Sequence, residues 1–238
     1  FTHSERKLNL RFEKAFSQKD TLDLVIHYTC NAGNSKGVKY FSPNPDTPDY
    51  NYQMWTQGQE ELNHFWFPCY DFPNDRVTSE IKVTVHEDLE TVSNGKLLSV
   101  THDKENKTKT FHWLQDKQHV TYLVSLVVGK YSIVNDKSEK LPLPYYVYPG
   151  METDAKAIFS QTKDMIQFFE NVTGTKYPWD KYSQTILYDF FGGMENTSAT
   201  NLIDAIPDRR QFKFDEKYSR FFTTLIAHEL AHMWYVDL

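Results

Sequence analysis

The last residues of the sequence read His228-Glu229-Leu230-Ala231-His232-Met233-Trp234-Tyr235-Val236-Asp237-Leu238. They place two histidines four positions apart, with a glutamate directly after the first, in an apolar run that favours a helix. Positions i and i+4 of a helix lie on one face, so His228 and His232 can direct both imidazoles at one metal ion. Glu229 lies about 100° further around the helix axis, within reach of a water bound to that metal. The stretch predicts a helix that carries a zinc site of the hydrolase type.

The chemistry of such a site assigns a role to each of these residues. A catalytic zinc commonly takes three protein ligands and leaves the fourth position to a water whose pKa falls to about 7. Glu229 is then the candidate general base. The alternative is a partly exposed helix end with two ordinary histidines, and it is disfavoured because His and Glu are costly to bury without partners. The sequence pattern indicates no third ligand.

Composition narrows the class of protein. The chain has 238 residues, of which 39% are hydrophobic and 24% charged, which is typical of a soluble globular protein with one large domain or two smaller ones. A net charge of −6 without a Lys/Arg run argues against nucleic acid and anionic membranes as partners. No apolar stretch is long enough to span a membrane, so we expect no membrane insertion. Compartment and oligomeric state stay open.

Two further features of the sequence concern its beginning and its cysteines. The N-terminal residues, from Phe1, fit neither a signal peptide nor an initiating Met, so we expect a cut end. Cys30 and Cys69 are expected to be two free, buried thiols rather than a disulfide.

Residues 1 to about 143 have the pattern of β-strands. Alternating apolar residues occur at Leu8, Leu10 and Phe12, at Leu22, Leu24, Ile26 and Tyr28, at Ile81, Val83 and Val85, and at Phe111 and Trp113. The denser run from Val120 to Val128 predicts a strand that is buried on both faces. Turn signals fall at Asn31–Asn34, Asn94-Gly95 and Asp103–Lys107. Regular strands with short turns predict an antiparallel sandwich or a saddle-shaped sheet.

The pattern changes to a mixture of helices and strands near Pro142 and Pro144. We expect a last strand at 145–148, a short strand at 185–188, and a helix that begins after Asp215 as N-cap. An earlier helix, ended by Gly174, is predicted from the apolar stripe Ile158, Thr162, Met165, Ile166, Phe169 and Val172. The prediction is an α+β chain with a β domain at 1–144 and a second domain at 145–238.

A second constellation lies upstream of the histidines, in Gly192-Gly193-Met194-Glu195-Asn196. Glycines let the backbone approach a ligand closely, and the glutamate can hold a cation. Taken alone, the default interpretation is a glycine turn followed by an exposed Glu. Together with His228-Glu229-Leu230-Ala231-His232, however, this loop resembles the zinc metallopeptidase family of aminopeptidase N and leukotriene hydrolase, the gluzincins.

Further matches carry the same resemblance over essentially the whole chain. Thr56-Gln57-Gly58-Gln59 and Phe67-Pro68-Cys69-Tyr70-Asp71-Phe72-Pro73 look like that family's T-Q-x-[QE] and F-P-C-x-D-x-P motifs. Tyr177-Pro178-Trp179 and Lys181-Tyr182 resemble the segment that precedes its G-x-M-E-N motif.

The resemblance implies an aminopeptidase that binds one Zn²⁺ and acts on peptides with a free N-terminus. By matching position, His228 and His232 would be zinc ligands and Glu229 the general base. Glu195 would hold the substrate's α-amino group with help from Gln59. Backbone groups of the loop would bind the substrate's main chain, at Gly192, Gly193 and Met194.

The family fold implies what the chain holds and what it lacks. A saddle-like β domain is followed by a thermolysin-like catalytic domain, of which this chain would contain only the first part. A Glu ligand on the next helix and a Tyr that stabilises the oxyanion would fall after Leu238, and some N-terminal strands would precede Phe1. We therefore expect the chain to be an inactive fragment of the enzyme. Met233, Tyr235, Val236 and the pair Thr197-Ser198 depart from the usual family residues.

Two other functions stay open at this point. Some relatives keep the fold as a non-catalytic scaffold, but a scaffold needs neither Glu229 nor Glu195. The leukotriene-hydrolase branch opens an epoxide with the same zinc, and it shares the G-G-M-E-N loop.

Overall fold

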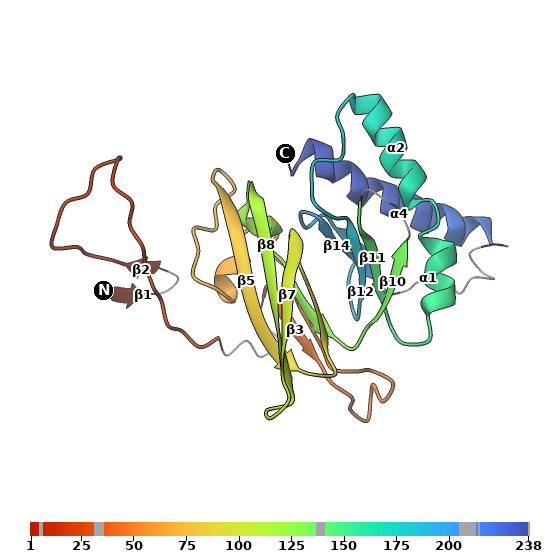
Figure 1. The fold of residues 1–238 in the computed structure, drawn as a ribbon, viewed down its shortest axis with the longest axis horizontal. Coiled ribbons are helices and arrows are strands. Elements are labelled where there is room, and N and C mark those ends of the chain that lie inside the picture. Colours follow the sequence, from red (N-terminus) through yellow and green to blue (C-terminus); the bar gives the residue numbers. More distant parts are fainter. Residues whose placement is uncertain (5–6, 31–35, 137–140, 205–212, 214, 238) are drawn as a thin grey trace.

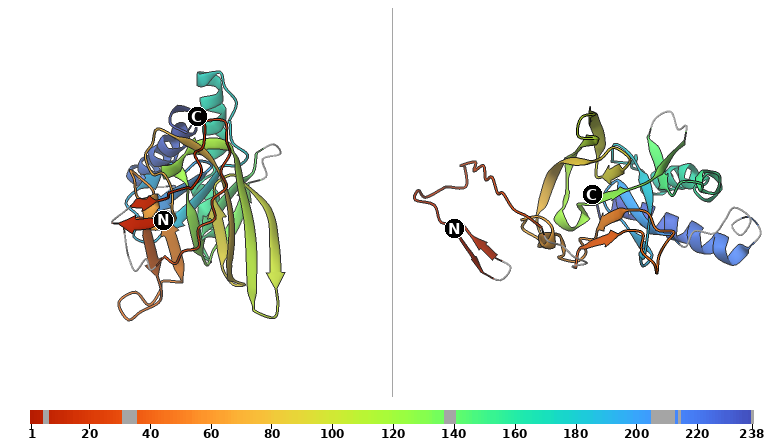
Figure 2. Two further views of the ribbon diagram at one scale, coloured as in Figure 1. Left: turned by 90° about the vertical axis from the view of Figure 1, so that its left-hand side faces the viewer. Right: turned by 90° about the horizontal axis from the view of Figure 1, so that it is seen from below.

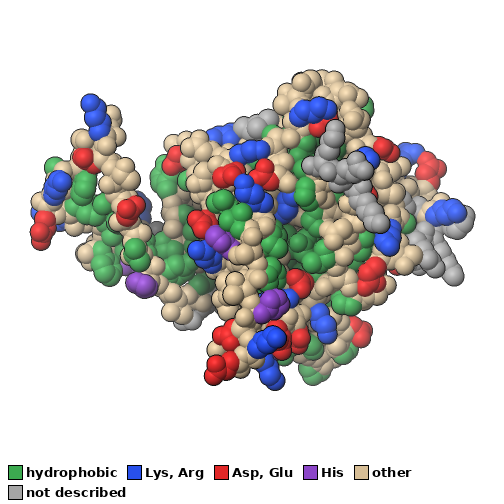
Figure 3. Space-filling model, in the orientation of Figure 1, with side chains coloured by type: hydrophobic (Ala, Val, Ile, Leu, Met, Phe, Trp, Pro, Cys, Tyr) green, Lys and Arg blue, Asp and Glu red, His purple; other side chains and the backbone are tan. Residues whose placement is uncertain are grey.

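The computed structural model describes residues 1–4, 7–30, 36–136, 141–204, 213 and 215–237. Its elements follow the predicted order, with strands first and a mixture of helices and strands after them (Figure 1). The fold is α+β, as the sequence predicts. Within the described residues, no helix is both long and apolar enough to cross a membrane. Acidic and basic side chains are interspersed over the face of the molecule drawn in Figure 3.

A long antiparallel sheet of order β5-β8-β7 forms the outer layer of the first part of the chain. Its strands are β5 (Arg76–His86), β7 (Lys96–Asp103) and β8 (Thr108–Val120). The predicted alternation is confirmed, because Ile81, Val83 and Val85 lie on the half-buried face of β5 and Phe111 and Trp113 are buried on β8. The predicted turn at Asp103–Lys107 joins β7 to β8.

A second antiparallel sheet, of order β3-β4-β9-β6, connects the outer layer to the rest of the molecule. Its strands are β3 (Val38–Phe41), β4 (Gln53–Thr56), β6 (Glu90–Ser93) and β9 (Leu126–Gly129). The single strand predicted for Val120–Val128 is wrong, since a 3-10 helix at Thr121–Leu123 separates β8 from β9. At this interruption a side chain binds the backbone: the Asn63 amide donates hydrogen bonds to the carbonyls of Thr121 and Val124.

The N-terminal arm differs most from the prediction. β1 (Thr2–Ser4) pairs only with β2 (Lys7–Asn9), and Leu10–Cys30 contains no strand. The strands predicted at Leu8–Phe12 and Leu22–Tyr28 are therefore wrong beyond Asn9. The arm extends away from the sheets (Figure 2), and an alternating sequence forms a strand only where a neighbouring strand pairs with it. The turn predicted at Asn31–Asn34 lies outside the described residues.

The two cysteines are free, as predicted. Cys30 is exposed at the end of the arm and Cys69 is half-buried, so the prediction that both thiols are buried is wrong.

The second part of the chain is a five-stranded sheet with helices packed against it. The sheet order is β10-β11-β12-β14-β13, with β11, β12 and β14 parallel and the two edge strands antiparallel. The strands are β10 (Ser132–Asp136), β11 (Leu143–Val147), β12 (Ser183–Leu187), β13 (Gly193–Met194) and β14 (Ala199–Ile203). β10 precedes residue 144 in the sequence and yet belongs to this sheet. The domain boundary near residue 144 stays a prediction.

The described residues of this part also form the helices α1 (Glu152–Ile158), α2 (Thr162–Thr173) and α4 (Glu216–Tyr235). The stripe from Ile158 to Val172 was predicted as one helix, and it spans two, because the chain turns after Ile158. Gly174 ends α2 in the left-handed conformation with φ of 68°, as its position predicts. Side chains of α1, α2 and α4 share one apolar core with β11, β12 and β14, and α4 also lies against β13.

Candidate active site

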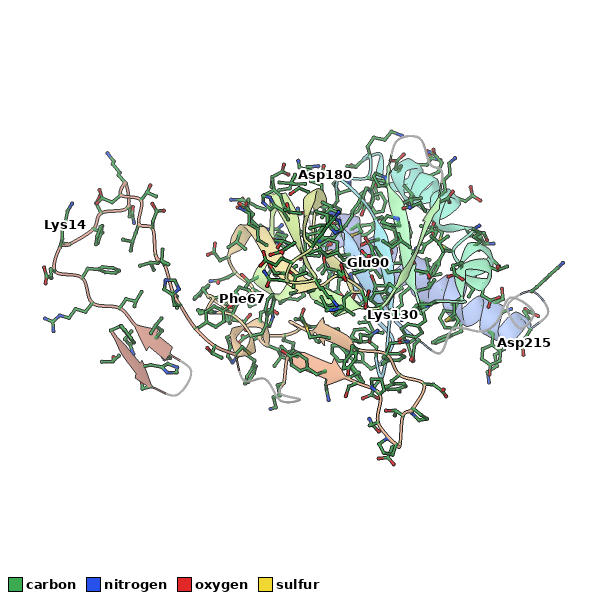
Figure 4. All side chains as sticks on the ribbon, turned by 60° about the horizontal axis from the view of Figure 1, so that its bottom comes forward. Lys14, Phe67, Glu90, Lys130, Asp180 and Asp215 are labelled. Carbon is green, nitrogen blue, oxygen red and sulfur yellow. The ribbon has the colours of Figure 1, made fainter. Side chains whose placement is uncertain are left out.

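Helix α4 carries the histidines, and its sequence explains its position. Asp215 lies at the start of α4 (Figure 4). Its carboxylate accepts hydrogen bonds from the backbone N–H groups of Lys217 and Tyr218, which confirms the predicted N-cap. The buried stripe faces the sheet and consists of Phe222, Ile226, Glu229, Leu230, Met233 and Trp234. The histidines lie beside this stripe, at the border between the core and the surface.

The structure brings His228 and His232 together as the i, i+4 spacing predicts. Their Nε2 atoms are 3.2 Å apart and their ring centroids 4.8 Å apart. Burial lowers the pKa of His232, and the charge of Glu195 opposes this effect. A lowered pKa favours the neutral imidazole, which is the form that binds a metal.

Glu229 turns inward from the same helix and is 3% exposed. Its carboxyl group lies against the backbone of Gly193, where a Cβ atom would be 2.6 Å from Cγ of Glu229. Within the described residues, its Oε2 atom has no hydrogen-bond partner. Burial, together with the charge of Glu195, raises the pKa of Glu229 to about 8. Packing against Gly193 holds this carboxyl group, and its Oε2 atom is left without a polar partner among the described residues.

Glu195 enters the site from the opposite side. It follows β13, the edge strand, which is paired to β14 through Gly193 with Leu202 and Met194 with Asn201. The side chain is 8% exposed. One ligand atom each from Glu195, Glu229 and His232 fall within 4.8 Å of one another. The loop and the helix, which are distant in sequence, thus meet at one point.

In the T-Q-x-Q segment, the glutamine that contacts the Gly192–Asn196 loop is Gln57, whereas the prediction concerned Gln59. Gln59 is exposed, so its role at the substrate's amine stays a prediction. Gln57 is buried, and its Nε2 donates to Sδ of Met194 over 3.1 Å. The motif contains both residues, and alternation along an extended segment would place them on the same face, so the sequence pattern could not tell them apart.

Asp237 is a buried residue at the site whose role the sequence did not reveal. Its side chain is fully buried just after α4, and burial next to Glu195 raises its pKa well above the usual range. Arg76, from β5, donates from Nη1 to the backbone oxygen of Asp237 over 3.0 Å. The first part of the chain therefore contacts the end of the histidine helix directly.

A hollow of about 970 Å³ runs along the outer face of α4 and ends at His228. Its lining includes Phe221 and Leu225 and the first turn of the helix at Asp215. The exposed imidazole of His228 lines this hollow.

The donor set fits a zinc ion. His228 and His232 would hold the ion through two imidazole nitrogens, which are ligands that zinc takes in catalytic sites, and the carboxylates of Glu195 and Glu229 lie close to His232. Glu195 and Glu229 are both buried, and the pKa of Glu229 is raised first by burial and then by the charge of Glu195. A cation held by the imidazoles next to these carboxylates would offset the cost of their buried charge.

Comparison with known proteins identifies both parts of the chain. Residues 1–123 match the Peptidase M1 N-terminal domain and residues 157–238 match the Peptidase family M1 domain. A probable aminopeptidase 2 of Sulfurisphaera tokodaii is 28% identical over 191 residues, covering 80% of this chain and 24% of that protein.

Two further relatives bear aminopeptidase names. The mitochondrial aminopeptidase 2 of Saccharomyces cerevisiae is 28% identical over 195 residues, covering 81% of this chain and 20% of that protein. Aminopeptidase N of Streptomyces lividans is 28% identical over 200 residues, covering 81% of this chain and 22% of that protein. The chain spans about a fifth to a quarter of the length of these relatives. The predicted resemblance is confirmed: this chain belongs to peptidase family M1, the gluzincin aminopeptidases.

Proposed function

We propose that the whole protein to which this chain belongs is a zinc-dependent aminopeptidase that removes the N-terminal residue of peptides. His228 and His232 would hold the zinc, and Glu229 would act as general base on the bound water. The observation that carries the proposal is the meeting of Glu195, Glu229 and His232 within 4.8 Å. The names of the relatives support the same reaction class.

The bound metal would supply a water of lowered pKa and polarise the scissile carbonyl. Glu229 then takes the proton of that water, since its carboxyl group is fixed against Gly193 beside the imidazoles. A neighbouring cation favours the ionised carboxylate, which is the form a base requires. The packing of Glu229 against Gly193 keeps the carboxyl group oriented.

Glu195 would select substrates with a free N-terminus. A buried carboxylate binds an α-ammonium through strong charge-assisted hydrogen bonds. An internal peptide nitrogen carries no charge, so only the first peptide bond lies over the metal. Backbone groups of Gly192, Gly193 and Met194 on the edge strand would bind the substrate's main chain.

The isolated chain is proposed to have little peptidase activity. A site with two imidazoles alone holds its metal weakly. The scaffold alternative is disfavoured by the two buried carboxylates, which are costly to keep without a ligand. The identity of the preferred N-terminal residue is left open.

The test uses the whole protein, an aminoacyl-p-nitroanilide and metal analysis. We expect hydrolysis that chelation abolishes and zinc restores. Glu229→Gln should keep the zinc and lower kcat by at least about 100-fold, as expected for loss of a general base. His102→Ala, at an exposed position of β7, serves as the control and should leave both quantities unchanged. A zinc-free protein with full activity, or an active Glu229→Gln variant, would refute the proposal.

A further inference from the structure

The segment that follows Glu195 is held by the first part of the chain. Asn94 and Gly95 link β6 to β7, and this Asn94-Gly95 link lies against Thr197 and Ser198. The Asn94 side chain is 1% exposed, and its Nδ2 donates to the backbone oxygen of Thr197 over 2.8 Å. The link thus reaches from the β-sheets into the loop that carries the candidate amine-binding carboxylate.

Asn94 is itself fixed by two more hydrogen bonds. Its Nδ2 also donates to the backbone oxygen of Leu123 over 2.8 Å, and its Oδ1 accepts from the N–H of Ser125 over 2.8 Å. All three polar contacts of this amide are buried. An amide with both donors and its acceptor engaged adopts one orientation, so Asn94 offers Thr197 a rigid donor.

Ser198 is held from two sides as well. The N–H of Gly95 donates to Ser198 Oγ over 2.7 Å, and Lys181 Nζ donates to the backbone oxygen of Ser198 over 3.1 Å. Lys181 also donates to the backbone oxygen of Ser93 over 2.7 Å, directly before the link. Ser198 has φ of 64°, a left-handed conformation that is costly for serine and persists only when the surroundings impose it.

These contacts lie two and three residues after Glu195. The N–H of Ala199 donates to the backbone oxygen of Asn196 over 2.7 Å, which closes the intervening residues into a tight turn. A turn of this size has little freedom, so a shift of Thr197 is transmitted to Glu195. The contact between the Glu195 carboxylate and an amine depends steeply on geometry. A shift of the carboxylate by a fraction of an ångström therefore weakens this contact.

We propose that Asn94 is a positioning residue for the aminopeptidase reaction: it anchors Thr197 from the β-sheet layer and thereby places the Glu195 carboxylate opposite the imidazoles of α4. The inference rests on the proposed function. It assigns the β-sheet layer a role in recognising the free N-terminus that does not require contact with the substrate. Loss of Asn94 weakens the grip on the amine and leaves the metal-binding helix in place.

The experiment measures the amine's contribution to binding in the whole protein. The Ki of an amino-acid hydroxamate is compared with that of its des-amino counterpart, since both bind the metal and only the first carries the amine. In the wild type, the ratio of the two values reports the contact with Glu195. We expect Asn94→Ala to reduce this ratio about tenfold, which corresponds to about 1.4 kcal/mol, with the Ki of the des-amino compound unchanged.

Two further variants make the result specific. Ser198→Ala removes the acceptor of the Gly95 N–H from the other side of the contact, and it should reduce the ratio in the same direction. Ser93→Ala is the matched control, because it removes a buried 2.7 Å hydrogen bond to the Ser125 oxygen at the same link without touching Thr197 or Ser198. It should leave the ratio unchanged.

The outcomes are distinguishable from failure of the proposed function. A wild type that neither hydrolyses the nitroanilide nor prefers the amine-bearing hydroxamate would refute the proposed function. A wild type with that preference, combined with Asn94→Ala and Ser198→Ala variants that keep the ratio within twofold, would overturn the inference. An equal rise of both Ki values would also overturn it, because that result indicates general damage to the site.

Discussion

Gly193 and Glu229 are in contact across the candidate site, and the contact leaves no room for a side chain at position 193. A Cβ atom there would be 2.6 Å from Cγ of Glu229 and would overlap its carboxyl group. Since Glu229 is enclosed by the core, it has little space in which to move aside. We expect Gly193→Ala to destabilise the chain by about 1 to 3 kcal/mol, the usual cost of overpacking.

A double-mutant cycle tests that this cost arises from Glu229. In a Glu229→Ala background the overlapping atoms are absent, so Gly193→Ala should cost less than about 0.5 kcal/mol. Urea denaturation of the four proteins gives the coupling energy. Equal costs in both backgrounds would show that the glycine is required for another reason.

The pKa of Glu229 makes the stability of the metal-free chain depend on pH. Burial raises this pKa from 4.5 to about 8 in the folded state. Between these two values the folded chain holds a proton that the unfolded chain has released. Stability is therefore fully retained below about pH 4.5 and falls as the pH rises towards 8.

Glu229→Gln removes this titration and tests the sign. With chelator present, the variant should gain stability relative to the wild type between pH 5 and pH 8, by roughly 2 to 4 kcal/mol. Glu13→Gln, at an exposed position in the N-terminal arm, should follow the wild type at every pH. A difference that shrinks as the pH rises would contradict the assignment.

The helix that carries the histidines was predictable because short-range patterns determine it. The i, i+4 spacing of the histidines and the Asp215 cap both describe contacts within one turn of α4, and the structure has them as predicted. The contact of Gly193 with Glu229 could not be foreseen, since it depends on how far β13 lies from the helix.

The failures have a common physical origin in contacts that are distant in sequence. Leu22–Tyr28 alternates like a strand, but a strand also needs a neighbour, and the arm has none within the described structure. Val120–Val128 is apolar like one long strand, yet the Asn63 amide, more than fifty residues upstream, binds the backbone where the strand is interrupted. Likewise, Asn94 and Arg76 approach the site only once both sheets are assembled.

Zinc should stabilise the chain through the two imidazoles. We expect added zinc to raise the melting temperature of the wild-type chain in a concentration-dependent manner, because a ligand that binds only the folded state stabilises it. His228→Ala and His232→Ala should each abolish most of the increase. Differential scanning calorimetry measures the melting temperature. The control is His102→Ala, which removes an exposed histidine of β7 and keeps the imidazoles of His228 and His232. An undiminished increase in His232→Ala would place the metal elsewhere.

Lys181 ties the two parts of the chain together at a buried position. The side chain is 4% exposed, donates to the backbone oxygens of Ser93 and Ser198, and lies with Nζ 5.3 Å from the ring centroid of Trp113. Methionine fills a similar volume but has no donor. Lys181→Met should therefore cost about 2 kcal/mol at pH 9, because it leaves two buried carbonyls without this partner.

The cost should also vary with pH in a defined direction. Burial lowers the pKa of Lys181 from 10.5 to about 7, so between these values the unfolded chain binds a proton that the folded chain does not. The wild type therefore gains stability relative to Lys181→Met as the pH rises from 7 towards 10. Lys96→Met, which removes an exposed ion pair with Asp116, should cost less than about 1 kcal/mol. A Lys181→Met penalty that is larger at pH 6 than at pH 9 would mean that the carbonyl oxygens hold the ammonium form strongly enough to outweigh its burial.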